Sequence, residues 1–79
     1  MILISIDKFA QKHVKSNPDV ELTDIKSSLK SALNRKNAGT TCYQCGNPIW
    51  AVGSAVIGQD ACFTCITGET DDSQDYEVK

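Results

Sequence analysis

Four cysteines, arranged as two close pairs, constrain this chain more than any other feature of its sequence. Two residues separate Cys42 from Cys45. Cys62 and Cys65 repeat that spacing, with sixteen residues between the pairs. A C-x2-C turn directs two sulfurs to one point about 2.3 Å from a metal ion, and two such turns complete a tetrahedron. The spacing therefore predicts a metal site of four thiolates, which we assign to one zinc ion per chain. Iron in the same geometry is the main alternative.

Chain length and cellular compartment help to decide whether the four cysteines bind a metal or serve another purpose, such as forming disulfides. An apolar core in a chain of 79 residues supplies only roughly 3–5 kcal/mol, so a further cross-link is expected. The apolar run at residues 1–4 has no basic residue before it and is too short for a signal peptide or a membrane span. We therefore expect a cytoplasmic protein with reduced thiols. Disulfides, four buried cysteines without a ligand and a thiol-redox function remain as weaker alternatives.

The predicted site is structural rather than catalytic. A catalytic zinc keeps one open coordination position, whereas four thiolates fill all four. His13 is the only histidine, and it lies on an apolar helical stripe, where a core or boundary residue is expected. No acid-base or nucleophilic group of residues accompanies it. We therefore do not expect an enzyme, and we assign no catalytic residue.

A first helix is predicted before Pro18. Apolar residues recur at helical spacing from Ile6 to Val14, and Ser5 is a suitable N-cap. The residue before a proline avoids the helical region, so the helix should end near Asn17.

A second helix is predicted up to Gly39. Thr23 is the expected N-cap, and apolar residues recur at helical spacing from Ile25 to Leu33. Asn37 and Gly39 provide suitable C-cap residues. The two helices should form a hairpin that buries one face of each.

A β-hairpin is predicted between the two cysteine pairs. Residues 49–52 and 55–58 are rich in apolar and β-branched side chains, and they flank Gly53 and Ser54, a favourable pair for a tight turn. Trp50 lies in the first of these segments. It is expected either to cover the small core or to be an exposed anchor for a partner protein.

The chain as a whole is predicted to be a single small α+β domain, residues 1–79. Residues 1–38 form the helical hairpin. Residues 39–68 form a four-cysteine finger of treble-clef or zinc-ribbon type that contains the β-hairpin. Residues 69–79 form an acidic tail after a short helical turn, with Tyr76 and Val78 as candidates for docking on the core.

Charge is distributed unevenly along the chain. Residues 1–41 carry seven basic and four acidic residues, while residues 42–79 carry one and six. The acidic half should repel nucleic acids and attract basic protein surfaces. We therefore expect a protein partner and no membrane association, with Glu69, Asp71 and Asp72 beside Trp50 as candidate contact residues.

The basic half supports an alternative function. Lys8, Lys12 and Lys15 recur at helical spacing, and a pair of helices can bind a nucleic acid. A solvated helix face accounts for the same lysines more simply.

The stretch "ALNRKNAGTTCYQCGNPI" resembles the start of DksA/TraR-type zinc fingers, where a helix and a G-T turn lead into C-x-x-C-G-x-P-I. The resemblance covers about residues 32–65. It implies a treble-clef-like finger that binds zinc through the four cysteines, and a regulator that contacts RNA polymerase through its secondary channel. The matching positions are Ala32, Leu33, Arg35, Gly39, Thr40, Cys42, Cys45, Gly46, Pro48, Ile49, Ala61, Cys62 and Cys65.

Overall fold

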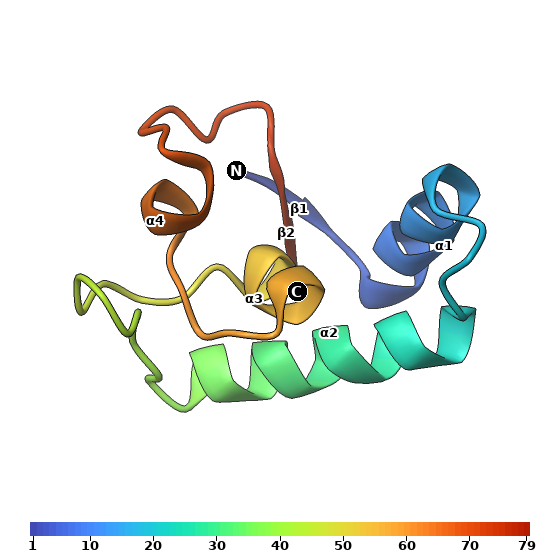
Figure 1. Ribbon diagram of the computed structural model, residues 1–79, viewed down its shortest axis with the longest axis horizontal. Coiled ribbons are helices and arrows are strands. Elements are labelled where there is room, and N and C mark those ends of the chain that lie inside the picture. The colour runs from blue at the N-terminus through green and yellow to red at the C-terminus, as the bar shows by residue number, and fades with distance from the viewer.

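The computed structural model describes residues 1–79 as a small α+β fold with four helices and two short strands (Figure 1). The longest helix, α2, runs along one edge of the molecule, and the other elements lie on the same side of it (Figure 1). In chain order the elements are β1 (Ile2–Ile4), α1 (Ile6–Ser16), α2 (Leu22–Asn37), α3 (Ala51–Ile57), α4 (Phe63–Thr67) and β2 (Tyr76–Val78).

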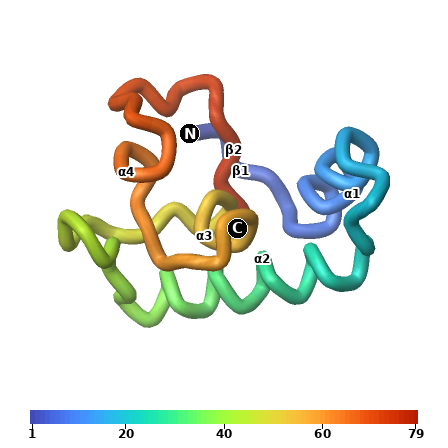
Figure 2. Tube along the Cα trace, viewed as in Figure 1, coloured from blue at the N-terminus to red at the C-terminus, as the bar shows by residue number.

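The two strands join the beginning and the end of the chain. They pair in parallel, with Ile2 opposite Tyr76 and Ile4 opposite Val78. The first and last segments of the tube accordingly lie side by side (Figure 2). Val78 is only 2% exposed, so the end of the segment predicted as an acidic tail is part of the core.

The first predicted helix is confirmed. Helix α1 begins at Ile6, and the Ser5 side chain caps it by accepting a hydrogen bond of 3.2 Å from the Lys8 amide. The helix ends at Ser16, and Asn17 is its C-cap. It buries Ala10 against the rest of the core.

The second predicted helix is confirmed, but its N-cap is not Thr23. Helix α2 begins at Leu22, and the Glu21 carbonyl accepts the first helical hydrogen bond from Ile25 at 3.1 Å. The chain enters the helix two residues earlier than predicted, without a side-chain cap. The predicted apolar stripe is buried, with Leu29 fully enclosed.

The β-hairpin predicted between the cysteine pairs is wrong. Most of its residues form helix α3, which ends at Ile57 and has Gly58 as its C-cap, with a φ of 76°. Gly53 has no positive φ and makes no turn. A Cβ atom on Gly53 would lie 2.4 Å from Cε3 of Trp50 and 2.5 Å from Cδ1 of Ile66, so the glycine is there for close packing. Short apolar runs do not distinguish a strand from a buried helix, and the Gly-Ser pair that favours a tight turn lies inside the helix here.

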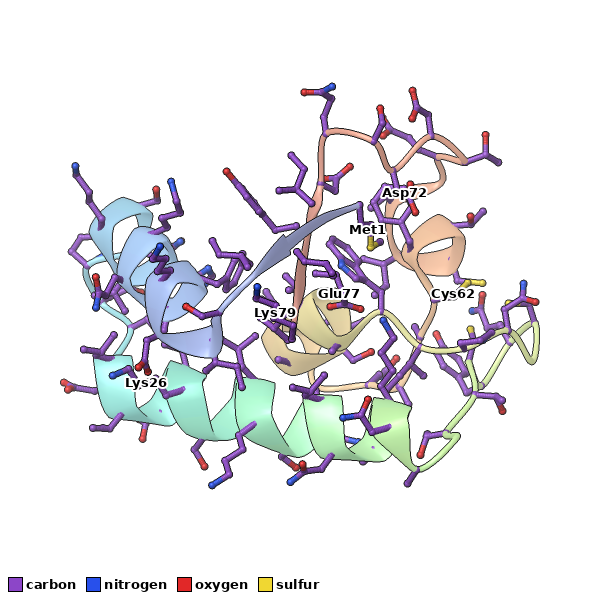
Figure 3. The ribbon with its side chains drawn as sticks, turned by 180° about the vertical axis from the view of Figure 1, so that it is seen from behind. Met1, Lys26, Cys62, Asp72, Glu77 and Lys79 are labelled. Carbon is purple, nitrogen blue, oxygen red and sulfur yellow. The ribbon has the colours of Figure 1, made fainter.

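The N-terminus of α3 receives its cap from the opposite end of the chain. Trp50, its own N-cap residue, provides no side-chain hydrogen bond to the first amides of the helix. Instead, the buried Glu77 carboxylate on β2 accepts hydrogen bonds from the amides of Ala51 at 2.9 Å and Val52 at 3.2 Å (Figure 3). Lys36 of α2 donates to the same carboxylate at 2.7 Å. Glu77 therefore connects β2, α3 and α2.

The main core lies between α2, α3, α1 and the sheet. Its members are apolar and less than a tenth exposed, and Trp50 and Phe9 pack at its edge. The buried members are Ile4, Ala10, Ile25, Leu29, Ala32, Ala51, Val52 and Val78. None of the four helices combines the length and the apolar character that a membrane crossing requires.

Candidate metal centre

The structure brings all four cysteines together. Their Sγ atoms lie within 4.8 Å of one another, and those of Cys45 and Cys62 are 3.3 Å apart. All four are free thiols. In a tetrahedral zinc–thiolate site with bonds of about 2.3 Å, neighbouring sulfurs lie about 3.8 Å apart. The cluster therefore fits a tetrahedral metal ion with only small adjustments.

The first pair sits in a tight loop closed by backbone contacts. The Cys42 amide donates to the Asn47 carbonyl at 2.6 Å, and Thr41 forms an isolated antiparallel bridge with Pro48. The Gly46 amide donates to the Cys42 carbonyl at 3.0 Å, with a φ of 76° at Gly46. Glycine adopts this conformation at low cost, unlike residues that carry a Cβ atom.

The second pair is positioned by helix α4. Cys62 is the N-cap residue, and its Sγ accepts a hydrogen bond of 3.4 Å from the Cys65 amide. Cys65 lies one turn later in the same helix. A sulfur that accepts a hydrogen bond from a backbone amide in this way is stabilised as a thiolate.

Backbone and side-chain contacts hold the two loops against each other. The Tyr43 amide donates to the Asp60 carbonyl at 3.1 Å, and the Trp50 amide donates to the Ala61 carbonyl at 2.9 Å. The Arg35 guanidinium of α2 forms an ion pair of 2.8 Å with the Asp60 side chain. Both cysteine pairs are thereby anchored to the end of α2 as well as to each other.

The four thiols differ in burial. Cys42 is 4% exposed and Cys62 is 6% exposed, whereas Cys45 and Cys65 are exposed. Around the buried pair there is only a small second core, which consists of Cys42, Ala61 and Cys62 with Ile66 packed on it. So few apolar contacts cannot hold these loops strongly.

The crowded thiols also differ in their affinity for protons. Burial opposes ionisation of Cys42, but hydrogen bonds from backbone amides, including those of Cys45 and Gln44, lower its pKa to about 6. The backbone amide of Cys65 lowers the pKa of Cys62. Hydrogen bonds with the thiols of Cys62 and Cys42, followed by burial, raise the pKa of Cys65 to about 12. The cluster thus combines thiolate-forming and proton-holding positions, and a bound cation would favour the thiolate at all of them.

Trp50 lies at the edge of the core. Its ring packs edge-on against Phe63, with 5.0 Å between ring centroids. Its indole Nε1 donates to the Tyr76 carbonyl at 2.8 Å. Of the two roles predicted for Trp50, these contacts match the one in which it covers the core. A contact with a partner protein through Trp50 stays a prediction.

The acidic candidates lie in the loop between α4 and β2. Glu69 and Asp71 are exposed. Asp72 forms an ion pair of 3.4 Å with the Met1 amino group (Figure 3). Asp72 and Trp50 line one cavity of about 260 Å³, while Glu69 and Asp71 lie outside it. The structure therefore brings only part of the predicted contact set together.

The sequence did not predict the ion pair between the buried Glu77 and the half-buried Lys36. Glu77 follows several acidic residues in the sequence, so it is assigned to the predicted acidic tail, residues 69–79. The alternation of Tyr76, Glu77 and Val78 is the one local signal of a strand there.

Comparisons of the chain with protein-family models, curated proteins and solved structures find no match. The resemblance of residues 32–65 to DksA/TraR-type fingers therefore stays a prediction.

Proposed function

We propose that this chain is a small protein-interaction module whose C-terminal half is held together by one structural zinc ion. The observation that carries the proposal is the convergence of four free sulfurs within 4.8 Å. Zinc prefers this tetrahedral all-sulfur arrangement, and four thiolates leave no position for a catalytic water.

A structural role follows from the small amount of core around the site. The second core contains only three buried residues, Cys42, Ala61 and Cys62. Zinc bound between the two cysteine pairs would cross-link segments that apolar contacts hold only weakly. The metal would thereby fix the loop from 42 to 50 against α3 and α4.

The exposed acidic residues support a basic protein partner. Glu69 and Asp71 are exposed, and four thiolates on one divalent cation would add two negative charges to the same half. Such a surface attracts basic protein surfaces and speeds their association at low salt. The DksA/TraR resemblance makes RNA polymerase the first partner to test.

A nucleic-acid function is weakened because several cations of the basic half already have partners within the chain. Arg35 pairs with Asp60, and Lys36 pairs with Glu77. Lys12 lies over the Tyr76 ring, with Nζ 5.8 Å from the centroid. These cations have partners within the chain and are less free to neutralise phosphates.

Two measurements test the proposal. Native mass spectrometry of protein purified without chelator should give one zinc per chain, and a metal-free folded protein with four reactive thiols would favour the thiol-redox alternative. A pull-down with the zinc-loaded protein should then capture a polymerase subunit. A bait with Glu69→Lys and Asp71→Lys should capture less, and a bait with Gln44→Ala should capture as much as the wild type.

Fluorescence anisotropy with duplex DNA and single-stranded RNA addresses the nucleic-acid alternative. No appreciable binding is expected near physiological salt. Binding that weakens linearly in the logarithm of salt concentration would instead identify Lys8, Lys12 and Lys15 as the functional residues.

A further inference from the structure

Strand β1 has an outer edge that no other element covers. On its inner edge, the Ile2 amide donates a hydrogen bond to the Asp75 carbonyl at 2.7 Å, and the Ile4 carbonyl accepts one from the Lys79 amide at 3.1 Å. In a parallel ladder, alternate residues direct their backbone groups to opposite edges. The N–H and C=O of Leu3 therefore face away from β2.

Strand β2 has no comparable free edge. The Tyr76 carbonyl accepts from the Trp50 indole, and the Val78 amide donates to the Glu77 carboxylate at 3.1 Å. Helices α1 and α3 also pack against β2. The open edge of the sheet is thus β1 alone.

The side chains along β1 are apolar and exposed. Leu3 is 63% exposed and Ile2 is 45% exposed. No helix or loop ribbon passes in front of β1 in the rear view (Figure 3). Exposed apolar edge strands with unpaired backbone groups are templates for pairing with another strand.

The two ends of this edge carry opposite charges. At its start, the acidic loop approaches β1. Asp72 is paired with the Met1 amino group at 3.4 Å, but Asp71 and Asp75 have no ion-pair partner in the chain, so this end stays acidic. At its end, Lys8 and Lys79 line a hollow of about 260 Å³ together with Leu3.

We propose that β1 pairs antiparallel with β1 of a second copy of this chain, centred on Leu3. A two-fold axis at Leu3 would place the acidic start of each edge beside the basic end of the other. Charge complementarity thus favours a second copy over an unrelated strand. The result is a four-stranded sheet in the order β2, β1, β1, β2.

The size of the contact sets the strength of the association. The central Leu3 pair would exchange two backbone hydrogen bonds and stack its two side chains. The strands have only three residues each, so the interface is small. The dimer should therefore form at high micromolar concentration and dissociate as salt rises, because its charged contacts are exposed.

Sedimentation of the metal-loaded protein over a concentration series tests this pairing. Leu3→Pro removes an amide that has no partner within the chain, so it should leave the fold and the metal content unchanged. It should weaken the dimer by about tenfold or more, since two intermolecular hydrogen bonds are lost. Leu3→Val keeps the amide and is the matched control. A chain that is monomeric at millimolar concentration, or a dimer that tolerates Leu3→Pro, would overturn the proposal.

A charge exchange tests the two-fold arrangement independently. Lys8→Glu and Asp72→Lys should each weaken the homodimer, because each places like charges across the interface. A mixture of the two variants should dimerise more strongly than either alone, since both contacts then become attractive. Equal association of the mixture and the separate variants would show that another surface is used.

Discussion

The Glu77 carboxylate lies 2.7 Å from the Lys36 ammonium, although the two residues differ greatly in their exposure to solvent. The Glu77 side chain is 3% exposed and that of Lys36 is 32% exposed. The buried carboxylate therefore depends on its partners more than the lysine does. It holds β2, α2 and the start of α3 in one place.

Substitution of Glu77 should be more costly than substitution of Lys36. Glu77→Ala removes the acceptor for Lys36 and for the Ala51 and Val52 amides, and should lower the free energy of unfolding by about 2–4 kcal/mol. Lys36→Met should cost less, about 1–2 kcal/mol, because the two amides still stabilise the carboxylate. Urea denaturation of both variants and the double variant measures the coupling. A double variant whose loss equals the sum of the single losses would show that the pair contributes nothing of its own.

Stability should depend on the metal. Structural zinc contributes apparent binding free energies of roughly 10–16 kcal/mol near neutral pH in small peptides, far more than the second core can supply. Chelation, or Cys45→Ser, should therefore unfold the loops around α4 and lower the melting temperature. Gln44→Ala changes an exposed residue between two candidate ligands and is the matched control. An unchanged melting temperature after chelation would exclude a structural metal.

Zinc binding should release protons, and its affinity should fall as the pH falls. The metal-free cluster holds a proton on Cys65, whose pKa is raised to about 12, and this proton must leave when zinc binds at neutral pH. Below the Cys42 pKa of about 6, protons also occupy the thiol that ionises most easily. Folded zinc protein therefore binds fewer protons than the metal-free state, so the zinc-dependent stability is lost on acidification. Calorimetric titration in buffers of different ionisation enthalpy counts the protons, and a count of zero at pH 7 would contradict this expectation.

Gly53→Ala should destabilise the fold, even though alanine favours helices. Its Cβ would lie 2.4 Å from the Trp50 ring and 2.5 Å from Cδ1 of Ile66, and overpacking of this kind costs about 1–3 kcal/mol. Ile66→Val removes the Cδ1 atom and should recover part of the loss. Thermal unfolding of the single and double variants gives the comparison. A gain in stability on Gly53→Ala would mean that the Trp50 ring moves aside freely.

The elements predicted well from the sequence are those set by local patterns. Helices α1 and α2 follow apolar stripes over several turns, and the Ser5 cap is a local hydrogen bond. The convergence of the cysteines follows from C-x2-C spacing, which a tight turn converts directly into geometry. Each of these signals lies within a few residues of the structure it determines.

The elements predicted poorly are those set by distant partners. Helix α3 has seven residues, no side-chain cap of its own and a glycine whose position is explained only by Trp50 and Ile66. Strands β1 and β2 have three residues each and are stabilised by each other from opposite ends of the chain. Such short segments have little periodicity, so the tertiary contacts decide their conformation.

The parallel pairing of β1 with β2 also has a consequence for the folding pathway. The helices can form early from local contacts, but Ile4 and Val78 meet only after nearly the whole chain has been ordered between them. The Glu77 cap on α3 must wait for the same event. Closure of the sheet is therefore expected to be a late and cooperative step, and any transient opening should expose both chain ends to proteolysis together.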